Sequence, residues 1–313
     1  MYQIGEIFNI DERRELNRVL AIVSGKQVEE FRISYVGQGQ NYLIFRALID
    51  EEFFCIRIGN TLGTENIFGL ERALIVCESN SIFTNKVLFS DFTCRKIHRP
   101  YMITTFISGN TYDLSEFQED EIHQFFTDFG MYLAKMHSIE HSYFSKELNA
   151  KNKLNIREYL SKRYVKLYEG LKKSENISID LIKLDKIYQF IYSTIDFESI
   201  IPHFIHRDIS ASNIIQSKNK FQCLIDFEHA IFFDFVWDFA KLELNILSAT
   251  EQKYRECFMK SYQSIISLER EKDSYQRFRL YYMLELMWAV INNYNNLQSV
   301  YLDILRGFIE KGG

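Results

Sequence analysis

The sequence predicts a bilobal α+β fold, with a small β-rich N-terminal lobe and a large, mostly helical C-terminal lobe. Before about residue 110, short segments rich in β-branched and aromatic residues alternate with turns. Beyond it, longer segments repeat apolar residues at helical spacing. We therefore expect an N-terminal lobe over residues 1–104, a connector over residues 105–109 and a C-terminal lobe over residues 110–313.

The N-terminal lobe is predicted to be a sheet with one helix. Its first two strands flank Gly37-Gln38-Gly39-Gln40, a sequence typical of a tight hairpin turn. A helix follows the third strand, because apolar residues recur at i, i+3, i+7 and i+10 from Ile67 to Cys77. The predicted strands are Phe31–Val36, Asn41–Ile49, Glu52–Ile58, Lys86–Phe89 and Tyr101–Phe106.

The C-terminal lobe is predicted to be helical apart from one island. Glu121–Ile139 places its apolar side chains on one helical stripe. Phe204–Phe233 differs, because it has the pattern of two short strands with loops. Further helices are predicted over Asn155–Lys172, Ile179–Thr194, Glu251–Ser267 and Ser274–Asn295.

Composition excludes several classes of protein. Of the 313 residues, 47% are hydrophobic and 25% are charged, as in an ordinary folded domain. The net charge of −5 argues against a nucleic-acid partner. The five scattered cysteines fit neither a disulfide framework nor a zinc site. Because the sequence has neither a signal-peptide pattern nor a long apolar segment, we expect a cytoplasmic protein that does not bind a membrane. We also expect no obligate protein partner.

One stretch carries the residues that phosphoryl transfer requires. It reads His206-Arg207-Asp208, then Asn213, then Ile225-Asp226-Phe227-Glu228. Phosphoryl transfer needs a carboxylate near the acceptor hydroxyl, and oxygen ligands that hold Mg²⁺ against the nucleotide phosphates. Any one of these residues alone is typical of a turn. Asp208, Asn213 and Asp226 together, at this spacing, predict a kinase-type phosphotransfer site.

These motifs resemble those of the aminoglycoside phosphotransferase and choline kinase family, small-molecule kinases related in fold to protein kinases. The family pattern is close to His-Gly-Asp, Asn, Ile-Asp-Phe/Trp-Glu and a later Asp-Phe/Leu-Ala, and Trp237-Asp238-Phe239-Ala240 matches the last part. Leu133–Ser138 and Tyr281–Leu286 resemble two of the family's helices. The resemblance covers residues 31–295 or so. It implies a protein-kinase-like fold, Mg²⁺ as cofactor and ATP or GTP as phosphate donor.

The resemblance also implies roles for the motif residues. Asp208 is expected to be the catalytic base or the residue that orients the hydroxyl, and Asn213 and Asp226 are expected to bind Mg²⁺. Asp238 is expected to brace the catalytic loop, and His206, like His137, to be structural. Arg207 departs from the family's usual glycine, and its side chain either pairs with a carboxylate such as Asp238 or is exposed.

The nucleotide-binding residues are expected in the N-terminal lobe. Gly37, Gly39 and Gln40 are candidates for contact with phosphate, because glycine lets the backbone approach closely. Arg57 would neutralise the α- and β-phosphates, and Glu71 would hold it in place. By family position, backbone groups of Thr105 and Ile107 would meet the adenine edge. A hairpin turn and exposed surface charges are the structural alternatives.

A protein kinase is the nearest competing class, because His206-Arg207-Asp208 has the form of a protein-kinase catalytic loop. Glu228, however, stands where a protein kinase has glycine. An Ala-Pro-Glu segment would also have to follow Asp226, and both prolines, Pro100 and Pro202, precede it. The sequence therefore favours a small-molecule acceptor.

The expected partners are a nucleotide and a small molecule with a hydroxyl group. By analogy with the family we expect an antibiotic such as an aminoglycoside, with phosphorylation conferring resistance. Choline, another amino alcohol or another metabolite is the alternative, with Tyr281, Tyr282 and Trp288 as possible aromatic surfaces for a quaternary ammonium. A nucleotide-binding scaffold without catalysis is a third reading.

Overall fold

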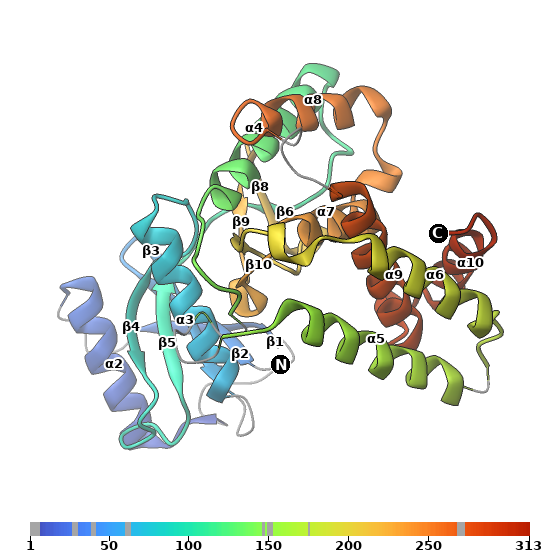
Figure 1. The fold of residues 1–313 in the computed structure, drawn as a ribbon. Coiled ribbons are helices and arrows are strands. Elements are labelled where there is room, and N and C mark those ends of the chain that lie inside the picture. Colours follow the sequence, from blue (N-terminus) through green and yellow to red (C-terminus); the bar gives the residue numbers. More distant parts are fainter. Residues whose placement is uncertain are drawn as a thin grey trace. The chain divides into compact units, whose positions relative to one another are not determined.

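The computed structural model describes residues 7–26, 31–38, 42–59, 64–145, 148, 153–174, 176–267 and 273–313. The chain forms two compact units (Figure 1). The first comprises Met1–Asn110 and Gln222–His229, and the second comprises Thr111–Phe221 and Ala230–Gly313. A short segment from the C-terminal half of the chain thus belongs with the N-terminal residues.

The first unit contains a five-stranded antiparallel sheet in the order β1-β2-β3-β5-β4. Asp50 and Glu51 close the β2–β3 hairpin, and Asp50 adopts the left-handed conformation (φ 54°) typical of a tight turn. The elements are α2 (Ile10–Ser24), β1 (Arg32–Gln38), β2 (Tyr42–Ile49), β3 (Glu52–Gly59), α3 (Thr64–Ser79), β4 (Val87–Asp91) and β5 (Tyr101–Thr105).

Helices α2 and α3 cover opposite faces of this sheet (Figure 1). Side chains alternate between the faces along a strand. Ile56 of β3 therefore packs with Leu16 of α2 in one core, and the adjacent Arg57 lies on the other face. Ser90 shares the face of Arg57 through the β4-β5-β3 register, and its hydroxyl donates to Glu71 of α3. Arg57 is thus placed on the α3 side of the sheet.

The second unit is mostly helical. It contains a two-stranded sheet of β10 and β7, and the chain also forms a three-stranded sheet in the order β6-β8-β9. Its helices are α4 (Glu119–His137), α5 (Ile156–Lys173), α6 (Leu181–Thr194), α7 (Val236–Asn245), α8 (Gln252–Gln263), α9 (Ser274–Ile291) and α10 (Gln298–Glu310). The strands are β6 (Asn110–Thr111), β7 (His203–Ile205), β8 (Ile214–Ser217), β9 (Lys220–Leu224) and β10 (Ile231–Phe233).

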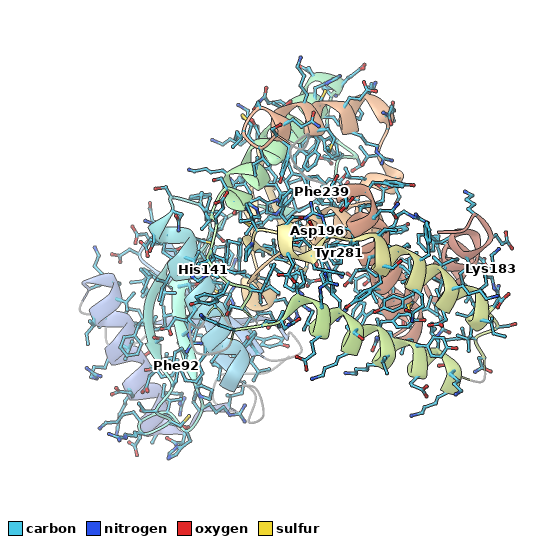
Figure 2. All side chains as sticks on the ribbon, viewed as in Figure 1. Phe92, His141, Lys183, Asp196, Phe239 and Tyr281 are labelled. Atoms are coloured by element: carbon cyan, nitrogen blue, oxygen red, sulfur yellow. The ribbon has the colours of Figure 1, made fainter. Side chains whose placement is uncertain are left out.

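Aromatic side chains fill the core of the second unit. Trp237 of α7 stacks on Tyr281 of α9 with ring centroids 4.8 Å apart, and both are fully buried. Figure 2 shows Tyr281 among the packed side chains of this unit. Helices α4 and α8 approach closely at Gly130, because a Cβ atom there would collide with the backbone of Phe258 and the side chain of Ser261.

The structure confirms the α+β class and the predicted strands and helices to within a few residues. Among the described residues, three α-helices were missed, namely α2, α7 and α10. The island Phe204–Phe233 contains four short strands rather than two, since β7, β8, β9 and β10 each span only three to five residues. Over the described ranges, no helix is long and apolar enough to cross a bilayer.

Candidate active site

The loop between β7 and β8 carries the first part of the sequence motif. It begins at His206, directly after β7, and ends in the 3₁₀ turn Ala211–Asn213. Arg207 adopts a left-handed backbone conformation (φ 68°), which costs a residue with a side chain roughly 1–2 kcal/mol. Surrounding contacts must therefore hold the loop in this shape.

Asp238, on helix α7, holds the start of this loop. Its carboxylate accepts hydrogen bonds from the backbone N–H groups of His206 (2.8 Å) and Arg207 (2.7 Å). The side chain is completely buried and lies 3.0 Å from Nε2 of His137. Hydrogen bonds to an ionised acceptor are stronger than neutral ones, so these contacts stabilise the strained backbone at Arg207.

His137 completes the support from helix α4. Burial lowers the pKa of His137 and outweighs the opposing effect of the Asp238 carboxylate, so the ring is neutral at pH 7. A neutral imidazole donates from one nitrogen and accepts at the other. Nε2–H therefore donates to Asp238, and Nδ1 accepts from the hydroxyl of Tyr262 at 2.9 Å. This arrangement keeps Asp238 in one orientation.

Asp208 and Asn213 lie together on the loop. The side-chain amide of Asn213 donates from Nδ2 to the backbone carbonyl of Asp208 (2.8 Å), and Nδ2 lies 3.3 Å from the Asp208 carboxylate oxygen Oδ2. Asn213 is buried, whereas about a third of the Asp208 side chain is exposed (32%). Asp208 can therefore meet a ligand, and Asn213 is fixed by its amide nitrogen.

Asn213 and Asp226 have donor atoms that suit a hard divalent cation. Nδ2 of Asn213 is bound to Asp208, and its amide oxygen Oδ1 accepts a long hydrogen bond from the Ser212 hydroxyl (3.5 Å). Oδ1 is the atom of Asn213 that can bind a cation. Within the described ranges, no group of three or more His, Cys, Asp or Glu side chains forms a metal cage. Mg²⁺ ordinarily takes only one or two protein ligands and completes its shell with phosphate oxygens and water. The residues thus fit Mg²⁺ bound together with a nucleotide.

Three charged residues near Asp208 were missed by the sequence reasoning. The ammonium of Lys241 on α7 lies 3.7 Å from Asp208 Oδ1 and 3.1 Å from Glu285 Oε2. Arg163 on α5 donates to the other oxygen of Glu285 at 2.9 Å. Two signals were present: Lys241 lies one helical turn after Asp238, and Glu285 interrupts the apolar run Leu284-Glu285-Leu286.

The structure shows that the Arg207 side chain contacts aromatic rings and not the Asp238 carboxylate. Its guanidinium lies over the rings of Trp237 (5.4 Å) and Tyr159 (6.0 Å). Only its backbone N–H bonds to Asp238. The side chain thus forms a cation–π contact with the unit's aromatic core.

Asp226 lies in the first unit, within Gln222–His229. It directly follows β9 and has a left-handed backbone (φ 66°). Burial raises the pKa of the Tyr42 phenol, and the nearby carboxylates of Glu228 and Asp226 raise it further, while Arg57 opposes them. The first unit therefore brings Asp226, Glu228 and Arg57 around one buried tyrosine.

Arg57 and Glu71 make separate contacts. The guanidinium of Arg57 is buried and donates from Nη1 to the Thr104 hydroxyl at 3.1 Å. Glu71 accepts from Ser90 instead. Among the described residues no ion pair joins Arg57 to Glu71, so the predicted bridge is not observed and the nucleotide-binding role of each stays a prediction.

The other predicted nucleotide contacts are only partly within the described residues. A Cβ atom at Gly37 in β1 would meet no described heavy atom within 4 Å, so packing does not require a glycine there. Gly39 and Gln40 lie outside the described residues. The N–H of Thr105 is bonded to Lys86 at 2.9 Å, and its carbonyl accepts from Asn85 at 2.8 Å. Ile107 follows the end of β5 and lies outside regular structure, and its contact with the adenine edge stays a prediction.

Comparison with known families identifies a match over most of the chain. The sequence model of the phosphotransferase enzyme family matches residues 84–276, more than half of the chain. The matched span contains Asp208, Asn213, Asp226 and Asp238. A comparison with curated proteins found no match.

Several solved structures share this fold. One is the gentamicin complex of APH(2")-IIa, with 18% identity, 97% of each chain covered and a TM-score of 0.66. Plasmodium vivax ethanolamine kinase has 15% identity, 95% of this chain and 86% of that chain covered, and a TM-score of 0.63. A protein of Haemophilus somnus 129PT described as a candidate fructosamine-3-kinase has 16% identity, 95% and 96% coverage and a TM-score of 0.64. The predicted protein-kinase-like fold is thereby confirmed.

Proposed function

Because the chain belongs to the phosphotransferase enzyme family, we propose that it transfers the γ-phosphate of ATP or GTP to a hydroxyl group of a small molecule, with Asp208 as its catalytic carboxylate. The observation that carries the proposal is the loop geometry around Asp208. Asp238 holds the loop backbone, Asn213 binds the Asp208 carbonyl, and the Asp208 carboxylate remains partly exposed.

The proposed chemistry uses Asp208 to orient the acceptor and to take up its proton. The acceptor oxygen forms a bond to the γ-phosphorus while the bond to the β-γ bridging oxygen breaks. The proton of the acceptor hydroxyl passes to the Asp208 carboxylate, and the nucleoside diphosphate leaves with the bridging oxygen. Because hydrogen bonds with Asp238 and Asn213 hold the loop that carries Asp208, its carboxylate needs little reorganisation to meet the hydroxyl.

In the proposed nucleotide site, Mg²⁺ and a guanidinium neutralise the charge of the phosphates. The amide oxygen of Asn213 and the carboxylate of Asp226 would hold Mg²⁺, which supplies charge neutralisation at the phosphates. The buried guanidinium of Arg57 would add a second cation. Glu71, on α3 at the same face of the sheet, would support it from there. Backbone groups at Gly37, Gly39 and Gln40 would approach phosphate, and those of Thr105 and Ile107 the base.

Structural neighbours support both donor nucleotides. APH(2")-IIa was solved with streptomycin and ATP, and APH(2")-IIIa with GDP and kanamycin. We therefore keep ATP and GTP as alternative donors.

For the acceptor we propose an antibiotic hydroxyl such as that of an aminoglycoside, so that phosphorylation would confer resistance. Neighbouring structures with gentamicin, streptomycin, kanamycin and hygromycin B support this class. The ethanolamine kinase neighbour supports an amino alcohol as the second candidate. The expected aromatic surfaces fit that second candidate less well, because Tyr281 is fully buried and the Lys241 ammonium lies 5.0 Å from the Trp288 ring centroid.

The experiment is a phosphate-transfer screen with MgATP and MgGTP. It covers aminoglycosides, macrolides, peptide antibiotics, choline, ethanolamine and fructosamines, with phosphorylated product detected by mass spectrometry. Asp208→Asn should abolish transfer, and chelation of the metal should do the same. The control is Asp303→Asn on α10, whose carboxylate is exposed and paired with Arg306. Undiminished transfer in Asp208→Asn would overturn the proposal, and nucleotide binding without any turnover would favour the scaffold reading.

A further inference from the structure

The ammonium of Lys241 is buried beside the proposed catalytic carboxylate. Only 4% of its side chain is exposed. A buried cation is unfavourable unless opposite charges and hydrogen bonds compensate it. The partners of Lys241 therefore explain its position.

Two carboxylates share the ammonium. Glu285 Oε2 lies 3.1 Å away and Asp208 Oδ1 lies 3.7 Å away. The rings of Trp288 and Tyr294 flank it, with centroids at 5.0 and 5.5 Å. Its position is thus restrained by charge on one side and by aromatic faces on the other.

Glu285 is itself firmly held. Its Oε1 atom accepts from Arg163 Nη2 and from the indole N–H of Trp237, both at 2.9 Å. Burial alone would raise the pKa of Glu285, but the charges of Lys241 and Arg163 outweigh it and hold the pKa at about 2. Burial likewise opposes the charge of Lys241, yet Glu285 and Asp208 raise its pKa. Glu285 and Lys241 therefore both carry charge at neutral pH, and Glu285 anchors Lys241.

Helix α7 therefore contacts the catalytic loop at two points. Asp238 binds the loop backbone through the N–H groups of His206 and Arg207. Three residues later on the same helix face, Lys241 meets the side chain of Asp208. Asn213 contacts the other carboxylate oxygen of Asp208, so each oxygen of Asp208 has one neighbour that restrains it.

We propose that Lys241 is a positioning residue for phosphotransfer: anchored by Glu285, its ammonium fixes the orientation of the Asp208 carboxylate towards the acceptor hydroxyl. This inference rests on the proposed function of Asp208. A purely structural reading is that the Lys241–Glu285 pair only joins α7 to α9. The two readings differ in what happens to turnover when the fold is kept.

The test compares Lys241→Met, Lys241→Arg and the double variant Lys241→Met with Glu285→Gln. Turnover is measured as phosphate transfer to an acceptor from the screen, or as hydrolysis of MgATP. A misplaced catalytic group costs on the order of a hundredfold, so we expect kcat of Lys241→Met to fall by that order, with KM for MgATP changed by less than about threefold. Lys241→Arg keeps the charge and should recover much of kcat.

The double variant separates stability from positioning. Glu285→Gln retains an oxygen for Trp237 and removes the carboxylate that Lys241→Met would leave without its ammonium. We expect it to unfold at a urea concentration close to that of the native protein but to remain slow. The control is Lys162→Met, which removes an exposed lysine paired with Glu158 on α5 and should leave kcat unchanged. A folded double variant with native kcat would overturn the proposal, as would an equally large loss in Lys241→Arg.

A double-mutant cycle tests the contact without any turnover. Lys241→Met and Asp208→Asn are combined, and their effects on the unfolding equilibrium are compared. Coupled neighbours deviate from additivity, so we expect the two substitutions to differ from additivity by about threefold or more in the unfolding constant. Strict additivity would overturn the Lys241 contact. Native turnover in Asp208→Asn, with the coupling intact, would instead overturn the proposed function.

Discussion

Replacing Asp238 by asparagine removes one charge and turns one acceptor into a donor. In the native protein Oδ2 accepts from His137 and from the N–H of His206, while Oδ1 accepts from the N–H of Arg207. The amide oxygen of asparagine should take the Oδ2 position, where two donors point. Its NH₂ group would then face the Arg207 N–H, so that two buried donors would lack an acceptor.

The cost follows from these contacts. Each unsatisfied buried donor costs about 1–3 kcal/mol, and the two remaining hydrogen bonds lose the charge of their acceptor. We expect Asp238→Asn to destabilise the fold by about 3–5 kcal/mol, which corresponds to a fall in Tm of roughly 6–10 °C. The strained backbone at Arg207 should relax, and misplacement of Asp208 should lower kcat on the order of a hundredfold.

Thermal unfolding by circular dichroism measures the first effect and phosphate transfer measures the second. Asp303→Asn is the matched control, because its carboxylate is 73% exposed and pairs only with Arg306 in the neighbouring turn. That control should change stability by less than about 0.5 kcal/mol. The reasoning about the loop is refuted if Asp238→Asn keeps native Tm and kcat, or if Tm falls while kcat stays native.

Three further predictions concern other parts of the molecule. Glu285 has a folded-state pKa of about 2 against an ordinary 4.5, so its charge stabilises the fold above pH 4.5. The urea midpoints of the native protein and of Glu285→Gln should therefore converge as the pH falls towards 2. A difference between the midpoints that stays constant with pH would contradict the buried charge. Gly130→Ala should lower the free energy of unfolding by about 1–3 kcal/mol, because its methyl group would strike the backbone of Phe258. Gly307→Ala should instead stabilise helix α10 by about 0.5–1 kcal/mol, because no described heavy atom lies within 4 Å of the new Cβ. Similar urea midpoints for the two variants would disprove this prediction. Arg57→Met should raise KM for MgATP about tenfold with a smaller effect on kcat, and an unchanged KM in steady-state kinetics would remove Arg57 from the nucleotide site.

Periodicity predicted several of the helices and strands that bury one face. Ile67 to Cys77 showed a helical repeat, and α3 is found there. Helix α7 was missed because its residues Trp237–Ala240 had been interpreted only as a motif, and because most of its residues, polar ones included, are buried. Helix α2 was missed although Asn9 and Glu12 form a capping box at its start.

The site was predictable where its chemistry follows from local spacing. Asp208 and Asn213 are five residues apart and share one loop, so their proximity could be inferred from the motif. Sequence spacing could not decide whether Arg57 pairs with Glu71, because the directions of the two side chains determine that contact. In the structure Arg57 bonds to Thr104, and Glu71 bonds to Ser90. Catalytic and metal-binding roles of these residues stay predictions.

By itself the sequence determined the α+β class, the family and the loop that carries Asp208 and Asn213, because hydrophobic periodicity and local motifs act over a few residues. Only the tertiary structure decided what surrounds Asp208. Lys241 and Glu285 are separated by 44 positions, and they meet because α7 packs against α9. Burial then forces their charges to pair, and no local pattern in the sequence encodes that contact.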